Sequence, residues 1–84
     1  MTIERFNAVV KQRPFQPFTI HTADGEKVRV KSPEFVWLPP KSRTLYVATG
    51  QGVDDEHVEY IDLLLVTKLS VGPENAPRKV GRGR

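Results

Sequence analysis

An Asp-Gly pair between two short stretches of alternating residues constrains the fold of this chain more than any other feature. Apolar and polar residues alternate in FTIHT before the pair and in KVRVK after it, and a period of two is typical of strands with one buried face. Asp24-Gly25 is itself a strong hairpin signal, because the type I′ turn requires positive φ at both central positions. The sequence therefore predicts an antiparallel hairpin of residues 17–23 and 26–31, with one apolar and one polar face.

The residues before this hairpin predict a helix over residues 2–12. Its apolar side chains recur at helical spacing and form one stripe, which consists of Ile3, Phe6, Val9 and Val10. Thr2 suits the N-cap, and Pro14 prevents the helix from continuing. A helix this short is marginal alone in water, so its stripe must pack on the sheet.

The junction RPFQPF between the helix and the hairpin has the P-x-x-P spacing of a polyproline ligand. We favour a structural interpretation of the same residues. In it Pro14 ends the helix, Phe15 packs beneath it and Pro17 opens an edge strand.

The rest of the chain predicts three further short strands. Ser32-Pro33 interrupts the second strand, which we expect to bend and continue through residues 35–38. Residues 62–64 are either a turn or continued strand, and a partly helical segment 58–68 is an alternative that VTKLSV disfavours. The further strands cover residues 44–48, 57–61 and 65–71, the last with Leu65, Thr67, Leu69 and Val71 on one face.

A helix followed by five short antiparallel strands, the second strongly bent, implies a mostly β (α+β) fold. So small a sheet avoids exposed edges by curling into a partly closed barrel. This element order resembles the Sm-like variant of the SH3-like barrel, in which an N-terminal helix also precedes five bent strands. We therefore expect one small barrel domain over residues 1–71. Residues 72–84, GPENAPRKVGRGR, have too few apolar residues to offset their ordering entropy and predict a disordered, flexible basic tail.

Several segments together resemble a family of small, uncharacterised bacterial proteins: RPFQPFTIH, the Asp-Gly turn, SPEF and IDLLLV. That family carries R-P-F-x-P-F-x-I-H, a D-G turn, H-P-E-F and I-D-L-L-x-V at similar places, whereas Ser32 stands here where the pattern has His. The resemblance implies a shared fold and brings no activity, cofactor or site residue with it.

Composition and charge exclude several classes of protein. The 84 residues include no Cys, which excludes disulfides and thiolate metal sites. No apolar run is long enough to span a bilayer and the N-terminus has no secretory apolar region, so we expect a cytoplasmic protein without membrane contact. The net charge of +3 lies entirely in residues 72–84, because residues 1–71 contain nine Lys/Arg and nine Asp/Glu. The folded body therefore has no overall charge that would attract nucleic acid.

The expected strands carry a few candidate binding residues. His21 should lie on the polar face of the first strand, and we interpret it as a surface histidine, with a ligand contact as the alternative. Trp37, with Phe35 and Tyr46, could form an aromatic surface on which peptides or bases stack. We favour the structural interpretation, in which most aromatic residues lie in the core and Trp37 shows a partly exposed edge. The expected core includes Phe6, Phe15, Phe18, Phe35, Leu45 and Leu69.

Two charged clusters are further candidates. Asp54, Asp55, Glu56 and His57 are potential metal ligands, but adjacent loop residues rarely converge on one ion and the EF-hand spacing is absent. We interpret them as a solvated acidic loop and expect no metal and no cofactor. Tail cations could contact nucleic-acid phosphates weakly or only keep the chain end soluble. These cations are Arg78, Lys79, Arg82 and Arg84.

No catalytic signature occurs in the sequence. The P-loop, dinucleotide-binding, zinc-protease and nucleophile-elbow motifs are all missing, and PPKSR and YIDLL stand where Sm proteins carry their RNA-binding loops. We therefore expect a non-catalytic protein-interaction module that binds a protein partner or associates with itself through a strand edge and surface aromatics. The alternative is an Sm-like nucleic-acid-associated protein that uses the basic tail. An enzyme is the least expected class, since it would need residues distant in sequence to join the 54–57 cluster.

Overall fold

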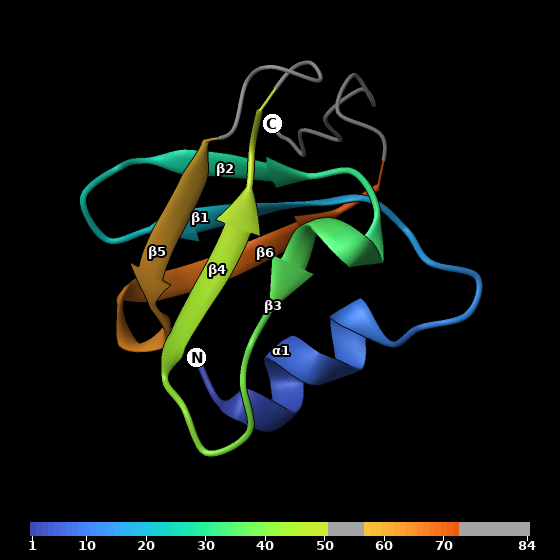
Figure 1. The fold of residues 1–84 in the computed structure, drawn as a ribbon, viewed down its shortest axis with the longest axis horizontal. Helices are drawn as coiled ribbons and strands as arrows, with labels where there is room; N and C mark the ends of the chain where they lie inside the picture. Colours follow the sequence, from blue (N-terminus) through green and yellow to red (C-terminus); the bar gives the residue numbers. More distant parts are fainter. Residues whose placement is uncertain (51–56, 73–84) are drawn as a thin grey trace, which may run out of the picture.

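Two three-stranded antiparallel sheets and one short helix make up the described part of the chain, which is residues 1–50 and 57–72 of a computed structural model (Figure 1). The first sheet has the strand order β2-β1-β6, and the second has the order β3-β4-β5. Figure 1 shows β4 and β5 crossing over the strands of the first sheet. The elements are α1 (Ile3–Val10), β1 (Phe18–Thr22), β2 (Lys27–Val30), the 3-10 helix η1 (Pro33–Phe35), β3 (Val36–Trp37), β4 (Thr44–Ala48), β5 (Val58–Asp62), the 3-10 helix η2 (Leu63–Leu65) and β6 (Val66–Val71).

The bent second strand expected from the sequence is in fact two strands. β2 ends at Val30, and η1 begins at Pro33 with the Phe35 N–H donating to the carbonyl of Ser32 at 3.2 Å. Because proline has no N–H to donate to a ladder, pairing stops here. The chain resumes as β3, which pairs with β4 in the second sheet. The prediction of five strands is therefore wrong, and the described residues form six.

The sequence predicts a partly closed SH3-like or Sm-like barrel, but the described residues form two three-stranded sheets and no closed barrel. The chain passes between the two sheets at η1 and η2, but no strand pairing between described residues joins them. Asp62 caps η2 by accepting a hydrogen bond from the Leu64 N–H at 3.0 Å, so residues 62–64 end a strand and begin a turn. Each 3-10 helix ends the strand pairing at the point where the chain passes from one sheet to the other. Among the strands of the described residues, β2, β6, β3 and β5 therefore each have one edge that pairs with no other strand.

The N-terminal helix is confirmed but is shorter than expected. The Thr2 hydroxyl accepts a hydrogen bond from the Arg5 N–H at 3.1 Å, which is the N-cap that the sequence predicts. At the other end the Lys11 N–H donates to the carbonyl of Asn7 at 2.9 Å, and the helix ends at Val10, before Pro14. Of the apolar residues in the helix stripe, Phe6 is the one that is fully buried.

The predicted hairpin forms with a different turn. Gly25 has a φ of 90°, whereas Asp24 does not have positive φ, so the type I′ assignment is wrong. The Gly25 N–H donates to the carbonyl of Thr22 at 3.0 Å, and the Thr22 N–H donates to the carbonyl of Glu26 at 3.0 Å. These bonds close a three-residue connection in which only the last residue needs the left-handed conformation, and glycine takes it without strain.

The side chain of Asp24 is held within this turn. The Thr22 hydroxyl donates to its carboxylate, and the Glu26 N–H donates to it at 3.3 Å. These bonds, from Thr22 first and then from the Glu26 backbone, favour the ionised form and lower the pKa of Asp24 below its ordinary value. Because the folded-state pKa is depressed, the stabilisation is present above the unfolded-state pKa and is lost as the pH falls through the folded-state pKa.

We expect an NMR titration of the Asp24 carboxyl carbon to give a pKa below that of an unstructured aspartate. Thr22→Val should raise this pKa towards the ordinary value, since it removes the first of the two donors, while Thr22→Ser should keep it low. An ordinary pKa in the native chain, or the same pKa in the valine and serine variants, would contradict this account of the turn.

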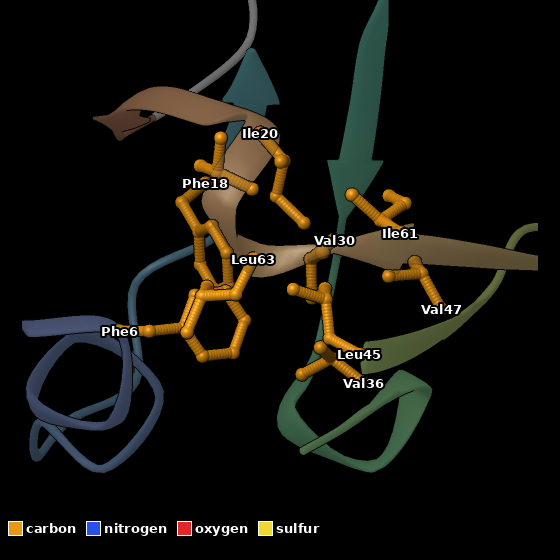
Figure 2. Packing of buried hydrophobic residues seen from close by; sticks show 10 residues of the cluster. Phe6, Phe18, Ile20, Val30, Val36, Leu45, Val47, Ile61 and Leu63 are labelled. Carbon is orange, nitrogen blue, oxygen red and sulfur yellow. The ribbon is translucent and has the colours of Figure 1, made fainter. Parts of the chain in front are cut away.

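The core lies between the two sheets and is closed at one end by α1 (Figure 2). Phe6 of α1, Phe18 of β1 and Leu63 of η2 converge there. The ring of Phe18 meets that of Phe6 edge to face, with centroids 6.1 Å apart, and that of Phe15 at 6.0 Å. The buried residues are Phe6, Phe18, Ile20, Val30, Val36, Leu45, Val47, Ile61, Leu63 and Val66.

Most of the core predicted from the sequence is confirmed, and two parts are wrong. Phe15 and Leu69 pack against the core as half-buried residues, but Phe35 is 42% exposed at the end of η1. In β6 the predicted apolar face is broken by a shift of register, because His21 pairs with Lys68 while the next residue, Thr22, pairs with Val66. A bulge of this kind reverses the alternation, so Val66 is buried instead of Leu65.

Candidate functional site

Three aromatic side chains lie next to one another across the outer face of the second sheet. Trp37 of β3 is opposite Tyr46 of β4, which is opposite Tyr60 of β5. The ring centroids of Trp37 and Tyr46 are 5.6 Å apart, and those of Tyr46 and Tyr60 are 4.8 Å apart in a stacked arrangement. We call these three residues the aromatic ladder. Alternation along the strands places their neighbours Val36, Leu45, Val47 and Ile61 in the core behind them.

The aromatic ladder is open to solvent at both ends. Trp37 is 60% exposed and Tyr60 is 70% exposed, whereas Tyr46 is half-buried between them. Cross-strand aromatic pairs stabilise a sheet, so the stacking has a structural role. It also orders three large rings in water, and ordered exposed apolar surface marks interaction sites. On the same face, two residues further along the strands, Ala48 lies opposite the exposed Val58 and extends this apolar surface.

A free strand edge runs beside the aromatic ladder. The Thr49 N–H donates to the carbonyl of His57 at 2.9 Å, which makes these two a hydrogen-bonded pair. In an antiparallel ladder such pairs alternate with pairs whose backbone groups point outwards. The backbone N–H and C=O of Tyr60 therefore point away from β4, towards the free edge of β5. An extended chain placed there could pair with β5 while touching the ring of Tyr60.

An acidic groove lies along this edge. It has a volume of about 310 Å³ and lies between β5 with η2 and the tip of the β1-β2 hairpin. Tyr60 forms part of its wall, and so do four carboxylate residues, Asp24, Glu26, Glu59 and Asp62. Carboxylates gathered around a hollow favour a ligand with a positive charge. The aromatic ladder and the acidic groove thus share one residue and form one continuous surface.

The structure brings together only part of what the sequence singled out. Trp37 and Tyr46 are in contact, with Trp37 exposed and Tyr46 half-buried, and Tyr60 completes the set. Sequence reasoning missed Tyr60, although its place between Glu59 and Ile61 marks it as an outward residue of its strand. Only the register of β5 on β4 shows that it stacks on Tyr46.

The other predicted site residues lie elsewhere. His21 is half-buried on the outer face of the first sheet, where its Nε2 is 2.8 Å from the Ser70 hydroxyl, and it is not part of the aromatic ladder. His57 Nε2 is 2.6 Å from a Glu59 carboxylate oxygen, an ion pair when the imidazole is protonated. Within residues 1–50 and 57–72 no three side chains are placed to hold a metal ion. The remaining candidates lie outside the described residues; they are Asp54, Asp55, Glu56, Arg78, Lys79, Arg82 and Arg84.

Comparisons with known proteins assign no family to the chain. No protein-family model matches it, and neither a curated protein nor a solved structure does so. None of the helices in the described segments has the length and apolar character that crossing a membrane requires. The geometry of the aromatic ladder and the acidic groove is therefore the basis for the functional argument.

Proposed function

We propose that this protein is a non-catalytic protein-interaction module that binds an extended segment of a partner protein across the aromatic ladder. The observation that carries this proposal is the exposure of Trp37 and Tyr60 on either side of Tyr46. Aromatic side chains bury much surface at a small cost in conformational entropy, and tryptophan and tyrosine are the commonest anchors of protein interfaces. Stacking holds these rings in place before a partner arrives, which lowers the cost of binding further.

The surroundings of the aromatic ladder define the chemistry of the partner segment. Exposed aromatic surfaces bind proline and other apolar residues of extended peptides. The acidic groove beside Tyr60 adds a preference for Lys or Arg next to the apolar residues. The free edge of β5 supplies backbone partners for a segment that runs as a strand. The proposed ligand is thus an extended peptide with proline or apolar residues flanked by basic ones.

We further propose that the two sheets are an open form of the SH3-like, Sm-like barrel. The support is the shared element order, with a helix first, a sharp bend at Pro33 after the first hairpin and a 3-10 turn at Leu63–Leu65 before the last strand. Aromatic recognition of proline-rich segments is a known use of SH3 domains, so this assignment agrees with the proposed ligand.

The proposal is tested with a synthetic peptide library in which a proline-rich core is flanked by arginines, and a matched library flanked by glutamates. Trp37 is the one tryptophan of the chain, so its fluorescence reports directly on the aromatic ladder. We expect arginine-flanked peptides to change the emission of Trp37 and to bind more tightly than glutamate-flanked ones. Light scattering of the peptide-free protein reveals whether the protein associates with itself.

Two variants distinguish specific binding at the aromatic ladder from non-specific binding elsewhere on the surface. Tyr60→Ala should weaken the best peptide by about 30-fold or more, because truncation of an aromatic anchor costs about 2 kcal/mol or more. Leu64→Ala is the control, since Leu64 is 62% exposed outside the aromatic ladder, and it should leave binding unchanged. If no peptide alters the Trp37 emission, or if both variants weaken binding equally, the proposal fails.

The alternative function, nucleic-acid association, is less compatible with this surface. Bases stack on exposed aromatic rings, and the ladder offers such rings. The four carboxylates of the adjacent acidic groove, however, would repel the phosphates that accompany the bases. Oligouridine added in the same Trp37 fluorescence assay is therefore expected to leave the emission unchanged, and quenching that Tyr60→Ala abolishes would favour this alternative.

A further inference from the structure

Several cations lie together on the outer face of the first sheet, although the net charge of residues 1–71 is zero. Val28 and Val30 of β2 face the core, so the residues that alternate with them, Lys27, Arg29 and Lys31, lie on the opposite side. β6 adds Lys68, which is opposite His21 of β1. We call Lys27, Arg29, Lys31 and Lys68 the basic face.

The basic face is not neutralised within the described part of the molecule. No ion pair between described residues involves any of its four cations, and the pair that does form is His57 with Glu59. The nearest acidic residue along β2 is Glu26, which precedes Lys27 and lines the acidic groove. Glu26 and Glu59 also line a hollow together with Lys27, Arg29 and Lys31, but among the described residues neither carboxylate forms an ion pair with these cations.

Polar side chains hold the centre of the basic face in a defined arrangement. The Arg29 guanidinium donates to the Thr19 hydroxyl at 2.9 Å and to the carbonyl of Gly72 at 2.6 Å. Both Lys27 and Lys68 are paired with His21, so they lie roughly 10 Å apart across three strands, and Lys27 lies about 7 Å from Arg29 along β2. Lysine, arginine, histidine and hydroxyl side chains spaced in this way match the oxygens of successive phosphates.

The same positions are poorly suited to a folded protein partner. Protein interfaces depend on buried aromatic or apolar anchors, and charged residues are depleted at their centres. Surfaces that bind nucleic acid are more polar and much more positively charged. The outward positions of the three strands contain no apolar residue; they are occupied by Thr19, His21, Lys27, Arg29, Lys68 and Ser70.

We propose that the basic face binds the phosphate backbone of single-stranded nucleic acid. All four cations of this site lie within the described residues, and the Arg29 guanidinium also holds the Gly72 carbonyl. This site is separate from the aromatic ladder and does not rest on the proposed function.

The test is fluorescence anisotropy of a labelled oligouridine with the full chain at rising KCl. Affinity should fall with salt with a logarithmic slope of about −0.7 for each phosphate contacted. The double variant Lys27→Gln/Lys68→Gln should reduce the slope by about 1.4 and weaken binding by about tenfold or more near 0.1 M salt. The matched control Lys11→Gln/Lys41→Gln removes the same charge from exposed residues elsewhere and should change affinity by about twofold at most.

Two further variants of the chain are measured in the same anisotropy assay. A chain truncated after Gly72 should still bind at low salt with a shallower slope, and Lys31→Gln should show a smaller version of the double-variant effect, with folding checked by circular dichroism. The proposal is overturned by an absence of binding at low salt, by equal losses in the double variant and its control, or by complete loss on truncation. It is also overturned if oligoglutamate or inorganic phosphate, added at the same total negative charge as unlabelled RNA, displaces the probe equally effectively.

Discussion

Replacing Phe18 with alanine is expected to lower the free energy of unfolding by about 3–5 kcal/mol. Phe18 is fully buried on the central strand β1 and meets the rings of Phe6 and Phe15. The substitution would therefore leave a cavity where the helix joins the first sheet, and the loss is a large share of the stability of a domain of this size. Urea unfolding followed by circular dichroism measures it.

The control for this prediction is the same substitution at Phe35. The sequence assigns both phenylalanines to the core, but Phe35 is 42% exposed, so Phe35→Ala should cost about 1 kcal/mol or less. Comparable losses in the two variants would show that Phe35 is part of the core after all and that η1 has a different position.

The second large effect is expected at Leu63, the first residue of η2. Leu63 is 1% exposed, whereas the two leucines that follow it, Leu64 and Leu65, are 62% and 54% exposed. Leu63→Ala should lower the free energy of unfolding by about 2–5 kcal/mol, and Leu64→Ala should change it by about 0.5 kcal/mol at most. Thermal unfolding separates these values, because 1 kcal/mol shifts the midpoint by about 4–8 °C in a domain of this size.

This pair of leucines tests the corner between the two sheets. Only a turn after Asp62, closed by the bond from the Leu64 N–H to the Asp62 carboxylate, directs the first leucine inwards and the next two outwards. If β5 continued without the turn, Leu63 and Leu65 would share one face, and Leu65→Ala would then be as damaging as Leu63→Ala.

The separation of charge gives the two proposed surfaces different partners. The acidic groove is lined by four carboxylate residues and by none of the four cations of the basic face. A basic peptide and a nucleic-acid backbone are therefore expected to bind at different sites. Removing the positive charge of Lys27 and Lys68 is expected to leave peptide binding at the aromatic ladder unchanged, which provides an internal control for both proposals.

Local patterns were sufficient to predict the helix, the first hairpin and most of the core. The N-cap at Thr2, the alternation on either side of Asp24-Gly25 and the buried positions of β4 all depend on residues close together in the sequence. The type of the hairpin turn was not predicted correctly, because Asp-Gly is compatible with several turns and the register of the flanking strands selects one. Within the candidate site, the sequence named Trp37 and Tyr46 as candidates, but it did not name Tyr60.

The sequence by itself determined the N-terminal helix, the first hairpin, and the entry of Phe6, Phe18 and Leu45 into the core, since these follow from side-chain period and from the backbone limits of proline and glycine. Only the tertiary structure decided that Pro33 divides one strand between two sheets, that Tyr60 stacks on Tyr46, and that Lys27 and Lys68 flank His21. The physical reason is that these contacts join residues far apart in the chain, and their partners are selected by strand register and sheet packing, which no local pattern specifies.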